Sequence, residues 1–155
     1  MPTNILRAAS RKPARRTGAP AAGTARHILL RAGRVSVRLE LLATPTADRI
    51  WAALPVHSTA ETWGASVHFE IPVASGRERG AKLNVTPGEI CFWSEDERVL
   101  IAFGPTPISG TGPIRLPSPC NVWARALDDV AVLAGVRPGE KVSMTARKEE
   151  QQDGP

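Results

Sequence analysis

Apolar and polar residues alternate over several short stretches of the chain, and this alternation predicts strands with one buried face. In RVSVRLELL, residues 34–42, every second residue from Val35 to Leu41 is Val or Leu, and the residues between them are charged or Ser. In ASVHFEI, residues 65–71, Val67 and Phe69 alternate with His68 and Glu70. Successive side chains of a strand point to opposite faces, so His68 and Glu70 are expected to lie side by side.

A second pattern predicts a hairpin and two further strands. Apolar runs at 90–93 and 99–103 flank the charged turn SEDE, residues 94–97. Two such runs around a short polar turn are typical of a β-hairpin. Residues 118–126 and 141–148 are predicted as strands, and residues 56–62 as an extended segment.

Two short helices are expected between these strands. Thr44 is a suitable N-cap and Pro45 a suitable first residue for a helix that ends before Pro55. A second helix is predicted over 127–136, with acidic residues in its first turn. Residues 75–82 and 110–119 are expected to form loops because they are rich in Gly, Pro or charged residues.

These elements together predict an all-β, β-rich domain with two short helices. Six to eight short strands separated by Gly and Pro turns favour a closed, mostly antiparallel barrel or a sandwich. The sequence contains no Gly-rich phosphate loop and no nucleophile elbow.

Charge is distributed unevenly along the chain. Residues 1–34 hold eight Lys or Arg and no acid, whereas the remainder holds twelve basic and fifteen acidic residues. Residues 1–33 are therefore interpreted as a disordered basic tail, 34–147 as the folded domain and 148–155 as a frayed end. A chain that starts near Arg34 is expected to fold as the full chain does.

The function of such a tail stays open between several alternatives. It could be inert or a mis-assigned gene start, a transit peptide, or a weak, non-specific binder of nucleic acid or anionic lipid through phosphates. No secretory apolar region or membrane-spanning stretch is apparent, so we expect a cytoplasmic protein with no membrane partner. Cys91 and Cys120 are expected to be buried reduced thiols, and no metal or cofactor motif is present.

The order and spacing of four motifs resemble those of a small prokaryotic cyclophilin-like domain family of unknown function. The motifs are TWGASVHFEIPV, PGEICFWSEDERVLIAFGPTPIS, SPCNVWARALDDV and RPGEKVSM, and the resemblance spans residues 34–146. It implies a closed antiparallel barrel capped by short helices, similar to that of cyclophilin prolyl isomerases.

The sequence does not match the active-site residue pattern of the cyclophilin prolyl isomerases. Cyclophilins place an Arg beside an apolar proline pocket, with a Gln on a nearby strand. The two Gln of this chain, Gln151 and Gln152, lie in its last residues, and no Arg falls in a cyclophilin-like active-site motif. Fold similarity alone does not license function, so we expect a non-catalytic module that binds an unknown small molecule or peptide. A prolyl isomerase or an unidentified hydrolase is the alternative.

The candidate ligand-binding residues come from the motifs of the family. Aromatic side chains beside rigid turns, with a few polar groups, are what a small-ligand site needs. For Trp93 and Phe103, filling of the core is the favoured competing explanation. His68 and Glu70 could form a general-base pair, but no Ser, Cys or Lys is spaced to act as its nucleophile. No catalytic residue is therefore assigned, and the predicted ligand-binding residues are Trp63, His68, Glu70, Phe103, Thr106 and Asn121.

Overall fold

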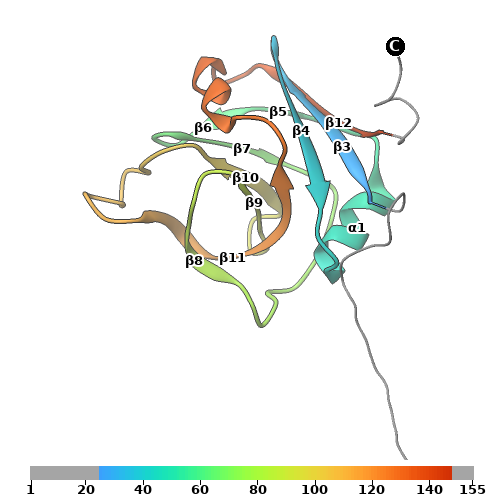
Figure 1. The fold of residues 1–155 in the computed structure, drawn as a ribbon, viewed down its shortest axis with the longest axis horizontal. Helices are drawn as coiled ribbons and strands as arrows, with labels where there is room; N and C mark the ends of the chain where they lie inside the picture. The colour runs from blue at the N-terminus through green and yellow to red at the C-terminus, as the bar shows by residue number, and fades with distance from the viewer. Residues whose placement is uncertain (1–24, 148–155) are drawn as a thin grey trace, which may run out of the picture.

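The computed structural model describes residues 25–147, which form a nearly closed, mostly antiparallel barrel (Figure 1). The main path of the sheet runs β5-β12-β3-β4-β11-β9-β10-β7-β6, and β8 pairs with β11 beside this path. The fold class expected from the sequence is thereby confirmed. The strands are β3 (His27–Ala32), β4 (Val35–Leu41), β5 (Val56–Thr59), β6 (Glu61–Thr62), β7 (Ser66–Glu70), β8 (Lys82–Val85), β9 (Glu89–Trp93), β10 (Arg98–Ala102), β11 (Ile114–Ala126) and β12 (Lys141–Arg147).

The two ends of this path are joined by a single residue. The terminal strands β5 and β6 are consecutive in the chain, and only Ala60 separates them. The amide of Ala60 donates to the carbonyl of Glu140 at 2.8 Å, and Gly139 donates back to Ala60 at the same distance. The covalent chain therefore bridges the gap between the ends of the sheet.

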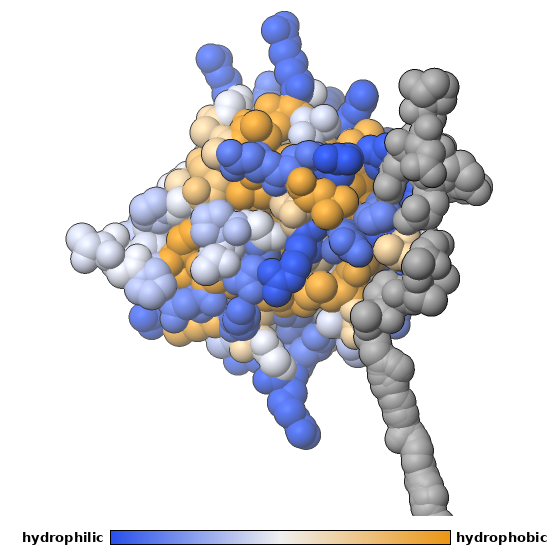
Figure 2. All heavy atoms as spheres, viewed as in Figure 1, coloured by the Kyte–Doolittle hydropathy of each residue, from blue (hydrophilic) through white to orange (hydrophobic). Residues whose placement is uncertain are grey.

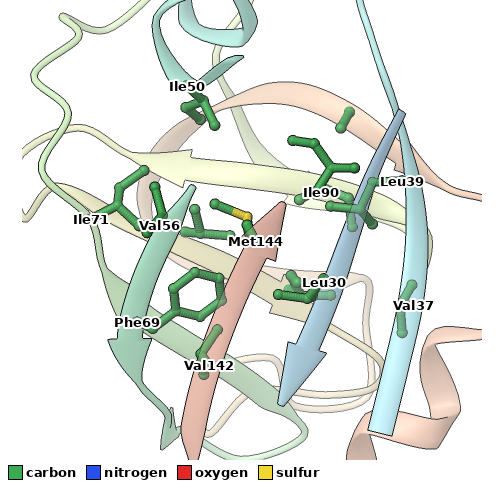
Figure 3. Close-up of a cluster of buried hydrophobic side chains, with 14 of the residues drawn as sticks. Leu30, Val37, Leu39, Ile50, Val56, Phe69, Ile71, Ile90, Val142 and Met144 are labelled. Atoms are coloured by element: carbon green, nitrogen blue, oxygen red, sulfur yellow. The ribbon is translucent and has the colours of Figure 1, made fainter. Parts of the chain in front are cut away.

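The main core fills the interior of the barrel (Figure 3). Alternation places Val37 and Leu39 of β4 inside, as the sequence predicts, while Arg38 lies at the surface. Phe69 of β7 and Met144 of β12 are almost completely buried in the same cluster. At about 25 cal/mol for each Å² of apolar surface removed from water, burial of this cluster is the main stabilising contribution to the fold.

The predicted boundary between tail and barrel is wrong. Residues 27–32, assigned to the tail, form β3, which pairs with β12 on one side and β4 on the other. Ile28 and Leu30 are buried in the main core. The Arg-rich context obscured the run Ile-Leu-Leu, whose apolar side chains contribute enough burial to hold a strand. The predictions of disorder for residues 1–24 and of fraying for 148–155 lie outside the described residues.

Two other boundaries differ from the sequence-based expectation. β8 lies in part within a predicted loop, because its short sequence KLNV carries little apolar signal. β11 begins at Ile114, inside the predicted loop 110–119, and its register shifts once within its pairing with β8 and once within its pairing with β9. Strand pairing with β8 accounts for an extended conformation despite the prolines of this segment.

The helices lie at opposite ends of β4 (Figure 1). Helix α1 (Pro45–Ala53) is capped as expected, with the Thr44 side chain accepting from the amide of Ala47. The predicted second α-helix is a shorter 3-10 helix, η2 (Val130–Gly135). Its β-branched and Gly residues disfavour a longer α-helix, and Asp129 caps it.

A smaller apolar cluster lies on the opposite face of β9 and β10. Cys91 and Leu100 point away from the main core and pack with Leu116 and Cys120 of β11. Both cysteines are buried and unpaired, as predicted. Burial raises the pKa of both thiols, that of Cys120 to about 12, so both stay protonated near neutral pH. On the face shown in Figure 2, apolar patches alternate with hydrophilic side chains.

Candidate functional site

The leading candidate site is a cavity of about 370 Å³ beside the second apolar cluster. Strands β6, β7, β9 and β10 supply most of its wall, Pro117 of β11 adds to it, and Trp63 and Asp96 come from the turns after β6 and β9. Its volume falls within the range of small-molecule sites. The residues that line it are Glu61, Trp63, His68, Trp93, Asp96, Arg98, Leu100 and Pro117.

The strand register explains why these side chains meet. Arg98 of β10 lies opposite Trp93 of β9, and Leu100 lies opposite His68 of β7. His68 in turn lies opposite Glu61 of β6. Residues directly opposite one another in antiparallel strands project on the same face, so four strands present one continuous surface.

Arg98 is the centre of the polar part of the cavity. Its Nε donates to the Asp96 carboxylate at 3.0 Å, and its Nη1 lies 3.3 Å from Nδ1 of His68. Its Nη2 lies 3.9 Å from the Glu61 carboxylate. The guanidinium is thus surrounded by partners from two strands, β6 and β7, and from the hairpin turn.

His68 is held as a neutral acceptor beside this guanidinium. Burial lowers the pKa of His68 below its usual 6.5, and the positive charge of Arg98 lowers it further, against the opposing effects of Glu61 and Asp96. An Arg N–H only donates, so Nδ1 of His68 accepts and Nε2 carries the proton. Near neutral pH the neutral ring therefore carries a hydrogen-bond donor at Nε2.

A tight contact between two of the family motifs fixes Trp63. The β6–β7 turn has Gly64 in a left-handed conformation with φ of 60°, and the Ala65 amide donates to the Pro105 carbonyl at 2.9 Å. A Cβ on Gly64 would lie 2.7 Å from Cδ of Pro107. A left-handed backbone and a close approach of neighbouring atoms coincide at this Gly, and only Gly satisfies both.

Two of the six predicted ligand-binding residues, Trp63 and His68, line this cavity. Glu70 lies on the same face of β7, opposite Arg98, but it is exposed and does not contribute to the lining. The expected proximity of His68 and Glu70 on one face is confirmed. The lining holds no Ser, Thr, Cys or Lys that His68 could activate as a nucleophile.

Phe103 and Thr106 do not line this cavity. Phe103 continues the inward alternation of Val99 and Ile101 and packs against the main core, which agrees with the competing core explanation. Thr106 is buried within its own loop, where its Oγ1 donates to the Arg115 carbonyl at 2.5 Å. Phe103 and Thr106 are thus engaged in the main core and in their own loop, and neither contributes to the lining of this cavity.

Asn121 belongs to a separate buried network. Its Oδ1 accepts from the Glu78 amide at 2.8 Å, and its Nδ2 donates to Thr46 Oγ1 and to the Gly76 carbonyl, both at 2.9 Å. Thr46 Oγ1 also donates to the Glu78 carboxylate at 2.5 Å. These bonds attach the loop that follows β7 to α1 and β11, so Asn121 is engaged in holding the fold.

Sequence reasoning missed most of the cavity. Trp93 was interpreted as a core residue, and Glu61, Asp96 and Arg98 were not singled out. A usable signal existed in the predicted hairpin, because a four-residue turn at 94–97 makes Trp93 and Arg98 neighbours across the strands. The approach of β6, β7 and β11 to this hairpin depends on the closed barrel and has no local sequence signal.

A second cavity of about 300 Å³ lies beside β8. Its acid, Glu89, is buried and already accepts from Lys82 Nζ at 2.7 Å and from the Thr86 amide at 2.9 Å. Within residues 25–147, no group of three or more His, Cys, Asp or Glu side chains is placed to hold a metal ion. No helix in that range has the length and apolar character needed to cross a membrane.

The chain is an antiparallel β-barrel domain with a cavity at its side that two Trp residues help to line. Comparison with known proteins identifies the family of this domain. A family model described as cyclophilin-like matches residues 26–145, so the chain belongs to the cyclophilin-like family. The match includes β3, in agreement with the corrected boundary.

A solved relative supports the same assignment. The solution structure of a hypothetical protein from Archaeoglobus fulgidus shares 32% sequence identity with this chain and superposes with a TM-score of 0.70. The match covers 81% of this chain and 97% of the archaeal one. Among curated proteins, none matches this chain.

Proposed function

We propose that this cyclophilin-like barrel is a non-catalytic binding module whose ligand, a small molecule or a short peptide segment, occupies the cavity beside Trp63 and Trp93. The observation that carries the proposal is the pairing of two half-buried Trp side chains with the fixed polar group Arg98 in one cavity of about 370 Å³. Binding sites combine apolar walls with a few oriented polar groups.

The rigidity of the cavity supports this function. Three neighbours hold Arg98, and the Gly64 turn fixes the backbone at Trp63. A site whose groups are already ordered loses little conformational entropy when a ligand binds. Tryptophan adds a large apolar contact and a ring N–H donor, a combination common at binding surfaces.

A fragment screen on the full-length protein tests the proposal. Ligands are detected by NMR shifts of the side chains of Trp63 and Trp93, and by quenching of Trp fluorescence. We expect Trp63→Ala and Trp93→Ala each to weaken binding by about tenfold or more, because each removes roughly 1.4 kcal/mol or more of contact energy.

Trp51 provides a matched control. It is also half-buried, but it lies on α1 and contacts Arg26 outside the cavity. Trp51→Ala is expected to leave fragment affinity unchanged. Denaturant unfolding of each variant establishes that the barrel is folded at the temperature of the binding assay. A complete absence of fragments that shift the cavity resonances contradicts the proposal.

A prolyl isomerase is a second candidate, and one observation favours it: the structure brings Arg98 beside the apolar walls of the cavity. In cyclophilins an Arg in such a place polarises the imide nitrogen of proline. The engagement of Arg98 by Asp96 and His68 argues against this role. A protease-coupled proline-peptide assay separates the two functions. If the protein accelerates proline isomerisation and Arg98→Ala abolishes this acceleration, the result favours an isomerase over a non-catalytic binding module.

A further inference from the structure

We infer that the cavity beside Trp63 and Trp93 selects an organic cation, namely an alkylated ammonium group, over neutral and anionic ligands of the same shape. This inference rests on the proposed binding function and specifies its ligand class. It follows from the distribution of exposed charge around the cavity and from the two indole rings in its wall.

The charges at the surface of the cavity are negative. The side chains of Glu61 and Asp96 are 57% and 53% exposed, whereas that of their shared partner Arg98 is only 20% exposed. With His68 neutral, two carboxylates face one guanidinium, so the lining carries a net charge of −1. A ligand that enters therefore meets carboxylates before it meets the guanidinium.

The carboxylates also keep free acceptor capacity. Of the Asp96 carboxylate, Oδ2 accepts from Arg98, and the distance of 3.9 Å between Glu61 and Arg98 exceeds that of a hydrogen bond. An ionised carboxylate has about four lone-pair sites. An anionic ligand would have to displace these groups from Arg98, whereas a cation adds a second partner to them.

The two Trp rings supply the other half of a cation site. A cation over an indole face is attracted by the ring quadrupole, and Trp is the strongest aromatic partner. The chain itself illustrates this contact, since the guanidinium of Arg26 lies 5.8 Å from the centre of the Trp51 ring. Trp63 and Trp93 are half-buried beside Glu61 and Asp96, as an ammonium with apolar substituents requires.

Three probes of similar shape test the selectivity on the full chain. They are choline, its uncharged carbon isostere 3,3-dimethylbutan-1-ol, and the anion 3,3-dimethylbutanoate. By titration at low salt, we expect choline to bind about tenfold tighter than the alcohol, and the anion to bind most weakly. Free trimethyllysine and a short peptide that contains it show whether the cavity prefers a quaternary ammonium group on a peptide side chain to one on a small molecule.

Charge-neutral variants locate the selectivity. Glu61→Gln is expected to lower choline affinity severalfold and to leave affinity for the alcohol unchanged. Glu70→Gln is the matched control, because it removes the same charge from the same face without touching the lining. Equal losses in both variants would assign the effect to general surface charge and overturn the inference.

The outcomes separate this inference from the proposed function. If the alcohol or the anion binds at Trp63 as tightly as choline does, the cavity is a binding site and the cation assignment is wrong. If no probe or fragment shifts the cavity resonances, the proposed function fails as well. Choline selectivity that is lost in Glu61→Gln and kept in Glu70→Gln supports both.

Discussion

At the scale of single residues, buried polar side chains divide into those that hold the fold and those that face a cavity. Asn121 is 1% exposed, and its amide is engaged at both ends by Glu78, Gly76 and Thr46. Arg98, by contrast, is partly exposed in a cavity. The sequence presents both as polar residues in strands, and the difference arises only from their partners.

Replacement of Asn121 tests this division. Asn121→Ala removes three hydrogen bonds and leaves the amide of the half-buried Glu78 without a partner inside the protein, which costs about 1–3 kcal/mol. We expect a loss of this size in denaturant unfolding, and faster hydrogen exchange in residues 75–79. Ligand affinity at the cavity is expected to stay unchanged in the folded variant.

Asn84→Ala is the control for this substitution. Asn84 is exposed on β8 and makes one long hydrogen bond, 3.3 Å, to the Ile114 carbonyl. Surface substitutions of this kind change stability by about 0.5 kcal/mol or less. Loss of ligand affinity in Asn121→Ala with unchanged stability would restore Asn121 to the binding site.

At the scale of elements, alternation was a sufficient guide to strands β4 and β7, each of which has one face in the main core. The β9–β10 hairpin was predicted from two apolar runs around a charged turn. The signal failed for β8, which is short and polar, and for β3, which follows an Arg-rich segment. Of the cavity, Trp63 and His68 were predicted because their motifs are specific. The remainder depends on pairing between distant strands, which no local pattern encodes.

The pairing of β7 with β10 has a consequence for pH dependence. Because the pKa of His68 is lowered in the folded state, the unfolded chain binds this proton more readily. Above the usual value of 6.5 both states are neutral, and the group has no effect on the free energy of unfolding. As the pH falls below 6.5, we expect His68 to lower stability, until the folded state is protonated as well.

Parallel unfolding of the wild type and His68→Gln between pH 7.5 and 5 measures this effect. As the pH falls, the free energy of unfolding of the wild type should decrease relative to that of the variant, because Gln does not bind a proton. Arg98, Glu61, Asp96 and Glu70 share this face and stay the same in both proteins. His57→Gln, at an exposed histidine, is the control. If the wild type and His68→Gln differ in free energy of unfolding by the same amount at every pH, the assignment is contradicted.

At the scale of the whole molecule, the position of β3 determines which segment of the chain is needed for folding. Ile28 and Leu30 are 0% and 1% exposed, and β3 lies between β12 and β4. Loss of two such side chains removes about 3–6 kcal/mol of burial, a large part of a typical stability of 5–15 kcal/mol. The sequence-based expectation for a chain that starts near Arg34 is thereby reversed.

Two truncations test the reversed expectation. Deletion of residues 1–33 is expected to abolish cooperative thermal unfolding, as followed by circular dichroism. Deletion of residues 1–24 keeps every described residue, and we expect it to retain a cooperative transition. A folded, cooperative 34–155 chain would show that the barrel tolerates the loss of a central strand.

The single-residue connection at Ala60 has a further consequence, for association with other chains. An exposed strand edge offers unpaired amides and carbonyls to any extended peptide, and this is how sheets add strands or aggregate. Here the terminal strands of the main path, β5 and β6, have only four and two residues, so that path presents no long free edge within residues 25–147. Strand β8, which pairs only with β11, offers a further edge of four residues with Lys82 and Asn84 exposed. Backbone strand addition to the main path is therefore disfavoured, and we expect a peptide ligand to be recognised by side chains inserted into a cavity.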